Sequence, residues 1–425
     1  MSAGFGTPWW VGDEALRWPP LPGSRRAEVL VVGGGFAGLS AAWTLREAGR
    51  EVLLLEAGLV GRASARAAGI LTASVEHDLR DHVRMHGEAR ALALWELGTA
   101  GVERAAALAA ALPGGEAAFT RPGSLYLARP GDEAVLREES ALRVGRGLDA
   151  ELVERPTNPL AAQGCRVALR APGDATCDPW GLCRGLAAAL AARGVAIHER
   201  TPVLRVDPAA RRAWTPAGEV QAGQVILAGQ EVPRALGDRA LGRGASGHWA
   251  PSVAFATFCL VTGVLPSERL EALGLSGGES FWDTGLPFFY GRLTPDRRLV
   301  VGGADLWLPL ARGPLVRRAF VRLERELRRR IPALGDAPLA GRWGGVVRVA
   351  PDGLPRLGGA DGLWRAGLAA GIGQALLVGH LAAERALGRS PPAAELLREE
   401  RPAGWGQRLR QPWESLRLLG SLLRV

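Results

Sequence analysis

The chain has 425 residues, of which 47% are hydrophobic, so it is long enough to bury a sizeable core and, at roughly 150 residues per domain, to form two or three domains. It carries 52 Lys and Arg against 43 Asp and Glu, and all of the basic residues are arginines. The absence of lysine excludes a lysine Schiff base, a lysine general base and a GxxxxGK[ST] phosphate loop. Basic runs such as 328–330 are interleaved with Glu324 and Glu326, which favours a solvated helix face over a nucleic-acid-binding patch.

The four cysteines and the N-terminal composition indicate a cytoplasmic protein. The cysteines show no CxxC spacing, and the first twenty residues lack the pattern of a signal peptide. We therefore expect reduced thiols. The most apolar long stretch, residues 29–45, is interrupted by three consecutive glycines, so no transmembrane segment is predicted.

The first informative stretch follows a leader (1–26) rich in proline and tryptophan. Residues 27–32 form an apolar, β-branched run typical of a buried parallel strand. Helical spacing follows until Gly49, and a second strand then ends at Glu56. The order of strand, glycine turn, helix, strand and acid predicts one complete βαβ unit.

A GxGxxG fingerprint lies within this unit, at Gly33, Gly35 and Gly38. Its glycines permit a tight turn, the approach of a pyrophosphate to the backbone, and close packing of helix on strand. The N-terminus of the helix offers free N–H groups to phosphates. Glu56, which ends the second strand, is placed to accept the ribose hydroxyls. We predict a dinucleotide site here rather than an incidental glycine turn.

The rest of the chain alternates between helix-rich and strand-rich patterns. A loop of small residues follows Gly61, and residues 77–112 are helical, with Asp78, His82 and His86 at spacing four. We interpret these three as a polar helix face rather than a metal site, and no metal is predicted. Further strands are expected at 119–130 and 218–230, an antiparallel sheet at 246–301, and a long helix at 315–330.

These patterns predict an α/β protein of two interleaved domains. A Rossmann-like domain is expected to use residues 27–86, 160–245 and 340–390, and an inserted antiparallel-sheet α+β substrate domain residues 87–159 and 246–339. A C-terminal tail (391–425) ends in an amphipathic, arginine-containing helix at 405–425. We interpret this helix as docking on the protein body or a partner subunit, with an anchor on a membrane surface as the alternative.

Taken together, the motifs resemble those of the D-amino-acid oxidase, glycine oxidase and sarcosine oxidase superfamily of flavoproteins, over most of residues 5–390. The resemblance is nearest to the branch that includes gamma-glutamylputrescine oxidoreductase. The residues that carry it are Gly33, Gly35, Gly38, Glu56, Ser64–Gly69, Asp178, Pro179, Ala228, Gly229, Asp352–Pro355, Gly371 and Gly373.

The resemblance implies a glutathione-reductase-like fold that binds FAD in an extended form, with its flavin ring between the two domains. It implies oxidation of a CH–NH bond of an amine or amino acid, by hydride transfer to flavin N5 and hydrolysis of the imine. The expected FAD contacts are Gly33, Gly35, Phe36, Ala37, Gly38, Glu56, Ala57, Ser64, Ala65, Arg66, Gly69, Ile70, Val203, Ala228, Gly229, Gly371, Ile372, Gly373 and Gln374.

The sequence departs from the family pattern at the substrate. Where amino-acid oxidases of this family often carry a carboxylate-binding arginine, this chain has Val347, and strand alternation directs its neighbour Arg348 to the opposite face. An amine substrate therefore fits better than a simple amino acid. Arg292 is predicted either to supply the missing cation or to form a structural pairing between the domains. Tyr290 is the preferred substrate contact, with a core tyrosine as the alternative.

Other side chains near the predicted substrate site carry weaker predictions. Trp282 and Asp283 are further candidates for the substrate wall. His248 and His380 are isolated, and His380 is interpreted as a packed or exposed histidine rather than a catalytic one. The flavin-tethering cysteine of sarcosine oxidases is missing, since the last cysteine is Cys259, so FAD should be noncovalent. The lysine that helps those oxidases to use oxygen is also missing.

Because this lysine is missing, the sequence leaves two alternatives for the electron acceptor. Either an arginine takes over its role with oxygen, or electrons pass to a quinone, as in a dehydrogenase at the inner membrane surface, which the tail at 405–425 would suit. A non-catalytic flavin-binding partner protein is the alternative from another class.

Overall fold

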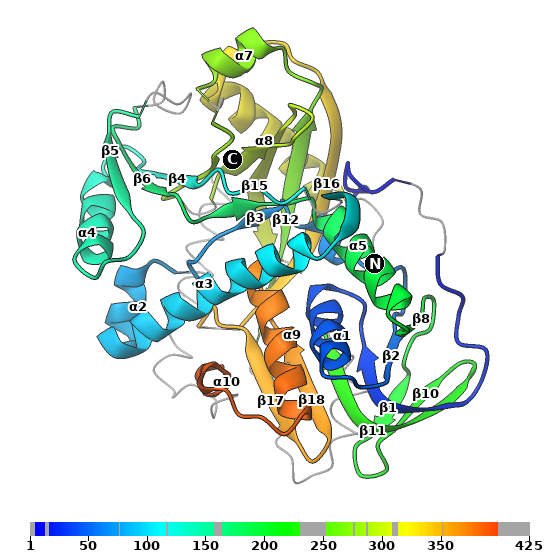
Figure 1. The fold of residues 1–425 in the computed structure, drawn as a ribbon. Helices are drawn as coiled ribbons and strands as arrows, with labels where there is room; N and C mark the ends of the chain where they lie inside the picture. Colours follow the sequence, from blue (N-terminus) through cyan, green and yellow to red (C-terminus); the bar gives the residue numbers. More distant parts are fainter. Residues whose placement is uncertain are drawn as a thin grey trace.

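The computed structural model describes residues 5–12, 17–75, 77–115, 118–156, 164–229, 252–274, 277–285, 288–307, 313–350 and 352–397. His248 and the predicted helix at 405–425 lie outside the described residues. Figure 1 shows two sheets, one above the other in the view, with the long helix α3 (Glu88–Ala110) running between them.

The first sheet contains the predicted βαβ unit. Its strands are ordered β17-β18-β11-β1-β2-β8, and β18, β11, β1, β2 and β8 run parallel. The bounds are β1 (Arg25–Val32), β2 (Val52–Leu55), β8 (Ala196–His198), β9 (Arg205–Asp207), β10 (Arg212–Thr215), β11 (Gly218–Ala228), β17 (Arg356–Ala360) and β18 (Leu363–Gly367).

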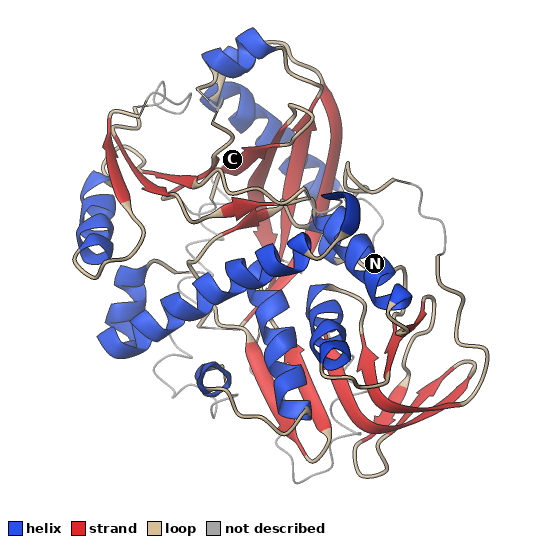
Figure 2. Cartoon of the chain, viewed as in Figure 1, coloured by secondary structure: helices blue, strands red, loops and turns tan. Residues whose placement is uncertain are grey.

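Both faces of this sheet are covered, which explains the continuous apolar runs of its strands. Helices α1 (Phe36–Glu47), α5 (Pro179–Ala192) and α9 (Ile372–Ala386) bury one face, against Val31, Leu54 and Ile226. The ribbon β9–β10 and Leu21 cover the other, against Leu30 and Leu53. The predicted Rossmann-like arrangement is therefore confirmed (Figure 2).

The second sheet has the order β16-β12-β15-β14-β13-β4-β6-β5. Its pairs are antiparallel except β4 with β13, which are parallel. Its strands are β4 (Ser124–Leu127), β5 (Glu151–Glu154), β6 (Val167–Ala171), β12 (Val253–Thr262), β13 (Ser280–Asp283), β14 (Tyr290–Leu293), β15 (Leu299–Trp307) and β16 (Leu339–Val349).

The two sides of the second sheet differ. Helix α8 (Pro314–Arg330) packs its apolar stripe on one side, which we call the α8 face. The opposite side, which we call the inner face, carries Cys259, Val300 and Trp343 and packs against Trp10 and Ala68. Ala68 belongs to the predicted loop 64–69, which we call the cofactor loop, so the inner face is turned toward that loop.

Two segments expected in the nucleotide-binding domain belong to the second sheet instead. Strand β6 pairs with β4 and β5, and β16 pairs with β12 along most of its length. The predicted boundaries at 160 and 340 are therefore wrong for these strands. Local composition does not reveal which sheet a strand joins, because pairing depends on distant partners.

The remaining elements surround the two sheets. The predicted helical region 77–112 divides at Gly87 (φ +80°) into α2 and α3. Among the described residues, no helix has the length and apolar character needed to cross a membrane. These elements are α2 (Leu79–His86), α4 (Glu133–Val144), α7 (Ser267–Ala272), α10 (Pro392–Leu396), the short helices at Ser64–Arg66, Pro113–Gly115 and Pro332–Leu334, and the pair β3 (Ile70–Leu71) and β7 (Ala175–Thr176).

Candidate cofactor and substrate site

The glycine turn brings three pieces of backbone into close contact. A Cβ on Gly33 (φ +108°) would lie 2.0 Å from the carbonyl oxygen of Ala228, and one on Gly38 would lie 1.8 Å from that of Gly33. No side chain fits in either place. At Gly35, a Cβ would lie 2.8 Å from Ser64 Oγ. The fingerprint therefore holds β1, β11 and α1 together and keeps the rim of the turn clear of side chains.

Glu56 joins the end of β2 to this turn. Its two carboxylate oxygens accept the N–H groups of Gly34 and Gly58, each at 2.7 Å. Burial raises the pKa of Glu56, and the backbone N–H groups oppose that rise. The carboxylate is held where the sequence predicts the ribose-binding acid.

The loop after β2 reaches both the turn and the second sheet. Ser64 Oγ accepts the N–H of Phe36 at 3.1 Å, which satisfies one of the free donors at the start of α1. The carbonyl of Ala65 accepts Trp10 Nε1 at 2.6 Å. Arg66 donates to the carbonyls of Gly344 and Gly6. These contacts fix the backbone of the loop.

Arg292 forms the other tie between this loop and the second sheet. Its guanidinium donates to the carbonyls of Ala68 (2.6 Å), Cys177 (2.8 Å) and Leu293 (3.2 Å), and the residue is only 2% exposed. Gly69 (φ +84°) makes room for it, since a Cβ there would lie 2.5 Å from Arg292 Nη2. Contacts of this kind are what the structural alternative for Arg292 predicts, because the guanidinium ties the loop to the second sheet.

Other predicted cofactor contacts lie at the end of β11, shortly before β9, after β2 and, for Ile70, on β3. Strand β11 ends at Ala228, and the N–H of Gly229 donates to Ala366 at 3.0 Å. Val203 is buried in the core beneath the sheet, while Ala57 lies exposed beyond Glu56.

Helix α9 begins at the edge where these strands end. Its first intrahelical bond runs from Ala375 N to Gly371 O, so the N–H groups of Ile372, Gly373 and Gln374 have no partner within the helix. Gln374 is buried, and its Oε1 has no hydrogen-bond partner among the described residues. Gly373 also has a packing role, because a Cβ there would lie 3.0 Å from the carbonyl carbon of Gly101 on α3.

These residues fit an extended dinucleotide cofactor. The glycine rim, the carboxylate of Glu56 and the free N–H groups of two helix N-termini match its phosphates and ribose. The buried orphan oxygen of Gln374 marks a place where a hydrogen-bond donor is missing. The described residues therefore provide what FAD needs at both ends of the site.

Tyr290 lies on the inner face. Its hydroxyl is 3.2 Å from Thr257 Oγ1 and 3.7 Å from Cys259 Sγ, and burial raises its pKa well above the ordinary value. Its ring lies over Gly302, where a Cβ would be 2.1 Å from Tyr290 Cζ. Thr257 was not predicted from the sequence, because a single threonine in an apolar strand carries no motif.

The register of β16 settles where its side chains point. Val347 pairs with Phe255 and alternates with Gly345 and Trp343, so it lies on the inner face. Arg348 pairs with Ala254 and lies on the α8 face. The inner face therefore presents a valine where the family motif would place a carboxylate clamp.

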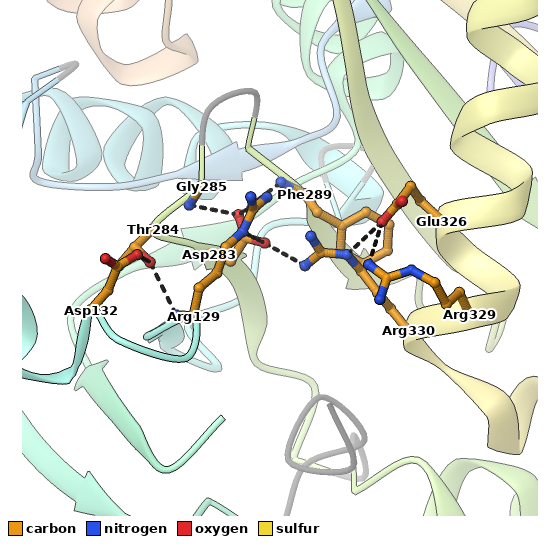
Figure 3. Close-up of polar contacts among 9 residues, drawn as sticks. All are labelled: Arg129, Asp132, Asp283, Thr284, Gly285, Phe289, Glu326, Arg329 and Arg330. Carbon is orange, nitrogen blue, oxygen red and sulfur yellow. Dashed lines mark hydrogen bonds and ion pairs between the residues drawn. The ribbon is translucent and has the colours of Figure 1, made fainter. Parts of the chain in front are cut away.

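Asp283 belongs to an ion-pair network rather than to the inner face (Figure 3). It accepts Arg129 Nε at 2.9 Å, the N–H groups of Gly285 and Phe289 at 3.1 Å each, and Arg330. The side chain is 3% exposed. The carboxylate joins β13 to α8 and has no free lone pair directed at a substrate.

Other candidates from the sequence also have packing roles. Trp282 stacks on Tyr126 with ring centroids 5.5 Å apart, and His380 Nδ1 lies 2.8 Å from Thr44 Oγ1, with a pKa lowered by burial. Among the described residues, no group of three His, Cys, Asp or Glu could hold a metal ion. All four cysteines are buried free thiols, and the pKa of each is raised by burial.

Curated relatives match this chain at different lengths. The gamma-glutamylputrescine oxidoreductase of Escherichia coli is 29% identical over 354 residues, which are 80% of this chain and 78% of the relative. The probable oxidoreductase OrdL of Haemophilus influenzae is 37% identical, but over 86 residues that make up only 20% of each chain.

Solved structures share the fold across nearly the whole chain. Glycine oxidase from Geobacillus kaustophilus has a TM-score of 0.70 at 21% identity, and covers 88% of this chain and 99% of its own. L-proline dehydrogenase from P. horikoshii has a TM-score of 0.70 at 18% identity, covering 88% and 96%. The family model DAO, described as FAD dependent oxidoreductase, matches residues 28–385. The chain belongs to this family of FAD-dependent oxidoreductases.

Proposed function

We propose that this protein oxidises a CH–NH bond of a small amine, with noncovalently bound FAD as the oxidant. The family supports the redox chemistry. The observation that carries the choice of an amine is the composition of the inner face, where Tyr290 and Thr257 lie opposite the cofactor loop and Val347 replaces a carboxylate clamp.

When bound, FAD would supply the redox chemistry, as the acceptor at N5 of a hydride from the carbon next to the substrate nitrogen. Water would hydrolyse the resulting imine to a carbonyl compound and release the nitrogen as ammonia or an amine. Glu56 and the glycine turn bind the nucleotide end. The N-terminus of α9, from Ile372, offers N–H groups and the positive end of a helix dipole, which stabilise negative charge on a reduced cofactor.

The amine preference follows from the charges available. A substrate carboxylate would need a cation on the inner face, but the guanidinium of Arg292 already donates to three backbone carbonyls. Arg348 lies on the other side of its strand. An uncharged or cationic substrate avoids the cost of an unpaired buried carboxylate.

An anaerobic reduction screen tests this function. Purified holoprotein is mixed without oxygen with amino acids, N-methyl amino acids, simple amines and polyamine conjugates, and the flavin absorbance is followed. We expect amines to bleach the flavin faster than amino acids do. If nothing bleaches it while dithionite does, the chain is a non-catalytic flavin-binding protein.

The second question is which acceptor reoxidises the cofactor. Because the chain has no lysine, the oxygen-activating residue of the related oxidases is missing, and we propose a quinone as the alternative to oxygen. Stoichiometric peroxide during turnover identifies an oxidase. Faster turnover with a soluble quinone, and loss of vesicle binding after deletion of 405–425, identify a dehydrogenase at a membrane surface.

The link between cofactor and protein is tested separately. We expect denaturing precipitation to leave all of the yellow colour in the supernatant, because Cys259 is buried on β12 next to Tyr290 and no later cysteine exists. Colour that stays with the polypeptide would show a covalent bond.

A further inference from the structure

Asp305 reaches the inner face because β15 is bulged. Before the bulge, Val300 and Gly302 lie on the inner face and Val301 on the α8 face. In the bulge, Ala304 packs in the core beneath α8, and its backbone has φ +55°.

The pairing with β12 shows where the extra residue sits. Phe258 pairs with Gly303, but Ala256 pairs with Leu306, so one additional residue of β15 lies between them. The bulge reverses the alternation, and without it the Asp305 side chain would point into the apolar core under α8. A positive φ at alanine costs free energy, and such strain is often found at functional sites.

The carboxyl group of Asp305 stands beside the hydroxyls already described. The pairing places Asp305 beside Thr257, because Leu306 pairs with Ala256 and Gly303 pairs with Phe258. Burial raises the pKa of Asp305 and the Thr257 hydroxyl opposes that rise, while the charge of Asp305 adds to the burial that raises the pKa of both Tyr290 and Cys259. The four side chains come from three adjacent strands, β12, β14 and β15. Together they form one polar cluster on the inner face, among the apolar side chains of Val300 and Trp343.

One oxygen of this carboxyl group lacks a partner. Asp305 Oδ1 is buried and makes no hydrogen bond to any described residue. Buried polar atoms in native proteins are nearly always paired, so an orphan acceptor indicates a ligand that donates to it. A carboxylate oxygen pairs best with a cationic N–H donor.

We propose that Asp305 is a specificity-determining residue that binds a second, non-reacting ammonium group of the substrate, so that the substrate class is a diamine. This inference rests on the proposed oxidation of amines. The reacting nitrogen must give up its proton before its lone pair can assist hydride loss. A carboxylate at that nitrogen would stabilise the protonated form, and is therefore better matched to the other nitrogen.

The test compares putrescine with butylamine, which has the same chain length and one ammonium group fewer. Dissociation constants come from anaerobic flavin reduction at varied amine concentration, and binding is checked by the shift of the melting temperature. We expect wild-type holoprotein to prefer putrescine. In Asp305→Asn the dissociation constant for putrescine should rise roughly 10- to 100-fold, as for a lost charged hydrogen bond, with little change for butylamine.

Two further variants keep the result interpretable. Asp305→Glu retains the charge and should retain part of the preference, while Asp336→Asn, whose side chain is 99% exposed, should behave as wild type. Equal affinity of the wild type for both amines, or an unchanged preference in Asp305→Asn, would overturn the role of Asp305 and leave amine oxidation standing. If no amine of any kind reduces the wild-type flavin, the proposed amine oxidation is itself wrong, and the role of Asp305 that rests on it is wrong with it.

Discussion

The carboxylate of Glu56 accepts the N–H of Gly34 at 2.7 Å, so the acid that ends β2 is bonded directly to the glycine turn that ends β1. This contact, with the matching one from Gly58, orients Glu56 before any ribose is present. The acid therefore supports the shape of the site as well as the cofactor.

We expect Glu56→Ala to yield protein that is largely free of FAD, because the ribose loses its acceptor and the N–H of Gly34 loses its partner. The unfolding free energy of the apoprotein should also fall by about 1–3 kcal/mol, the cost of unsatisfied buried donors. The flavin-to-protein absorbance ratio measures the first effect and denaturant titration the second. Glu51→Ala, at an exposed position before β2, is the control. Unchanged flavin content in Glu56→Ala would contradict the assignment.

Arg292→Ala should act on stability more than on substrate choice. Removal of the guanidinium leaves the carbonyls of Ala68 and Cys177 without their donor and opens a cavity beside Gly69, for a loss on the order of 3 kcal/mol or more. Thermal unfolding followed by circular dichroism measures this loss.

The control for Arg292→Ala is Arg50→Ala, which removes a half-exposed ion pair with Glu28 and should change stability by less than about 1 kcal/mol. A variant of Arg292 with normal stability, but with lost affinity for anionic substrates, would instead make Arg292 a clamp.

The sequence was sufficient for the parts of the site that are local along the chain. The fingerprint, its helix and Glu56 occupy one continuous βαβ unit, in which each glycine of the turn is needed for a stated conformation or close approach. For Arg292 the sequence left two possible roles, because the carbonyls that its guanidinium binds, at Ala68 and Cys177, are far away in the sequence.

Features that depend on non-local pairing could not be predicted. The membership of β6 and β16 in the second sheet depends on their partners, not on their composition. The position of Asp305 on the inner face could not be predicted from the sequence. Regular alternation from Val301 would direct the Asp305 side chain into the core, and only the bulge, opposite the stretch from Ala256 to Phe258, reverses that direction.

Gly373→Ala should destabilise the protein even without cofactor. The added methyl group would meet the backbone of Gly101 at 3.0 Å, where α3 crosses α9, and overpacking of this kind costs about 1–3 kcal/mol. Denaturant titration of the apoprotein measures the effect. Gly23→Ala, where a Cβ would contact nothing within 4 Å, is the matched control. An apoprotein of wild-type stability would show that Gly373 serves only the approach of the cofactor.

The stability difference between Asp305→Asn and the wild type should depend on pH, in a direction set by the burial of Asp305. Desolvation raises the pKa of Asp305 to about 6 from 3.8, against opposing contributions from Thr257 and Arg322. Between these two values the folded protein binds more protons than the unfolded chain, so this group makes the folded state less stable as pH rises. Tyr290 and Cys259 stay neutral throughout this range, because burial raises their pKa values.

Replacement by asparagine removes the ionisation, so Asp305→Asn should be more stable than the wild type at pH 8, by up to about 3 kcal/mol at 1.36 kcal/mol per pKa unit. The difference should shrink as pH falls from about 6 toward 3.8. Unfolding titrations in urea at several pH values, without amine, measure it. A variant that gains stability but loses the putrescine preference shows that the charge is kept for binding at the expense of stability. If Asp305→Asn is less stable than wild type at pH 8, the carboxylate has a structural partner and the orphan oxygen no longer indicates a ligand.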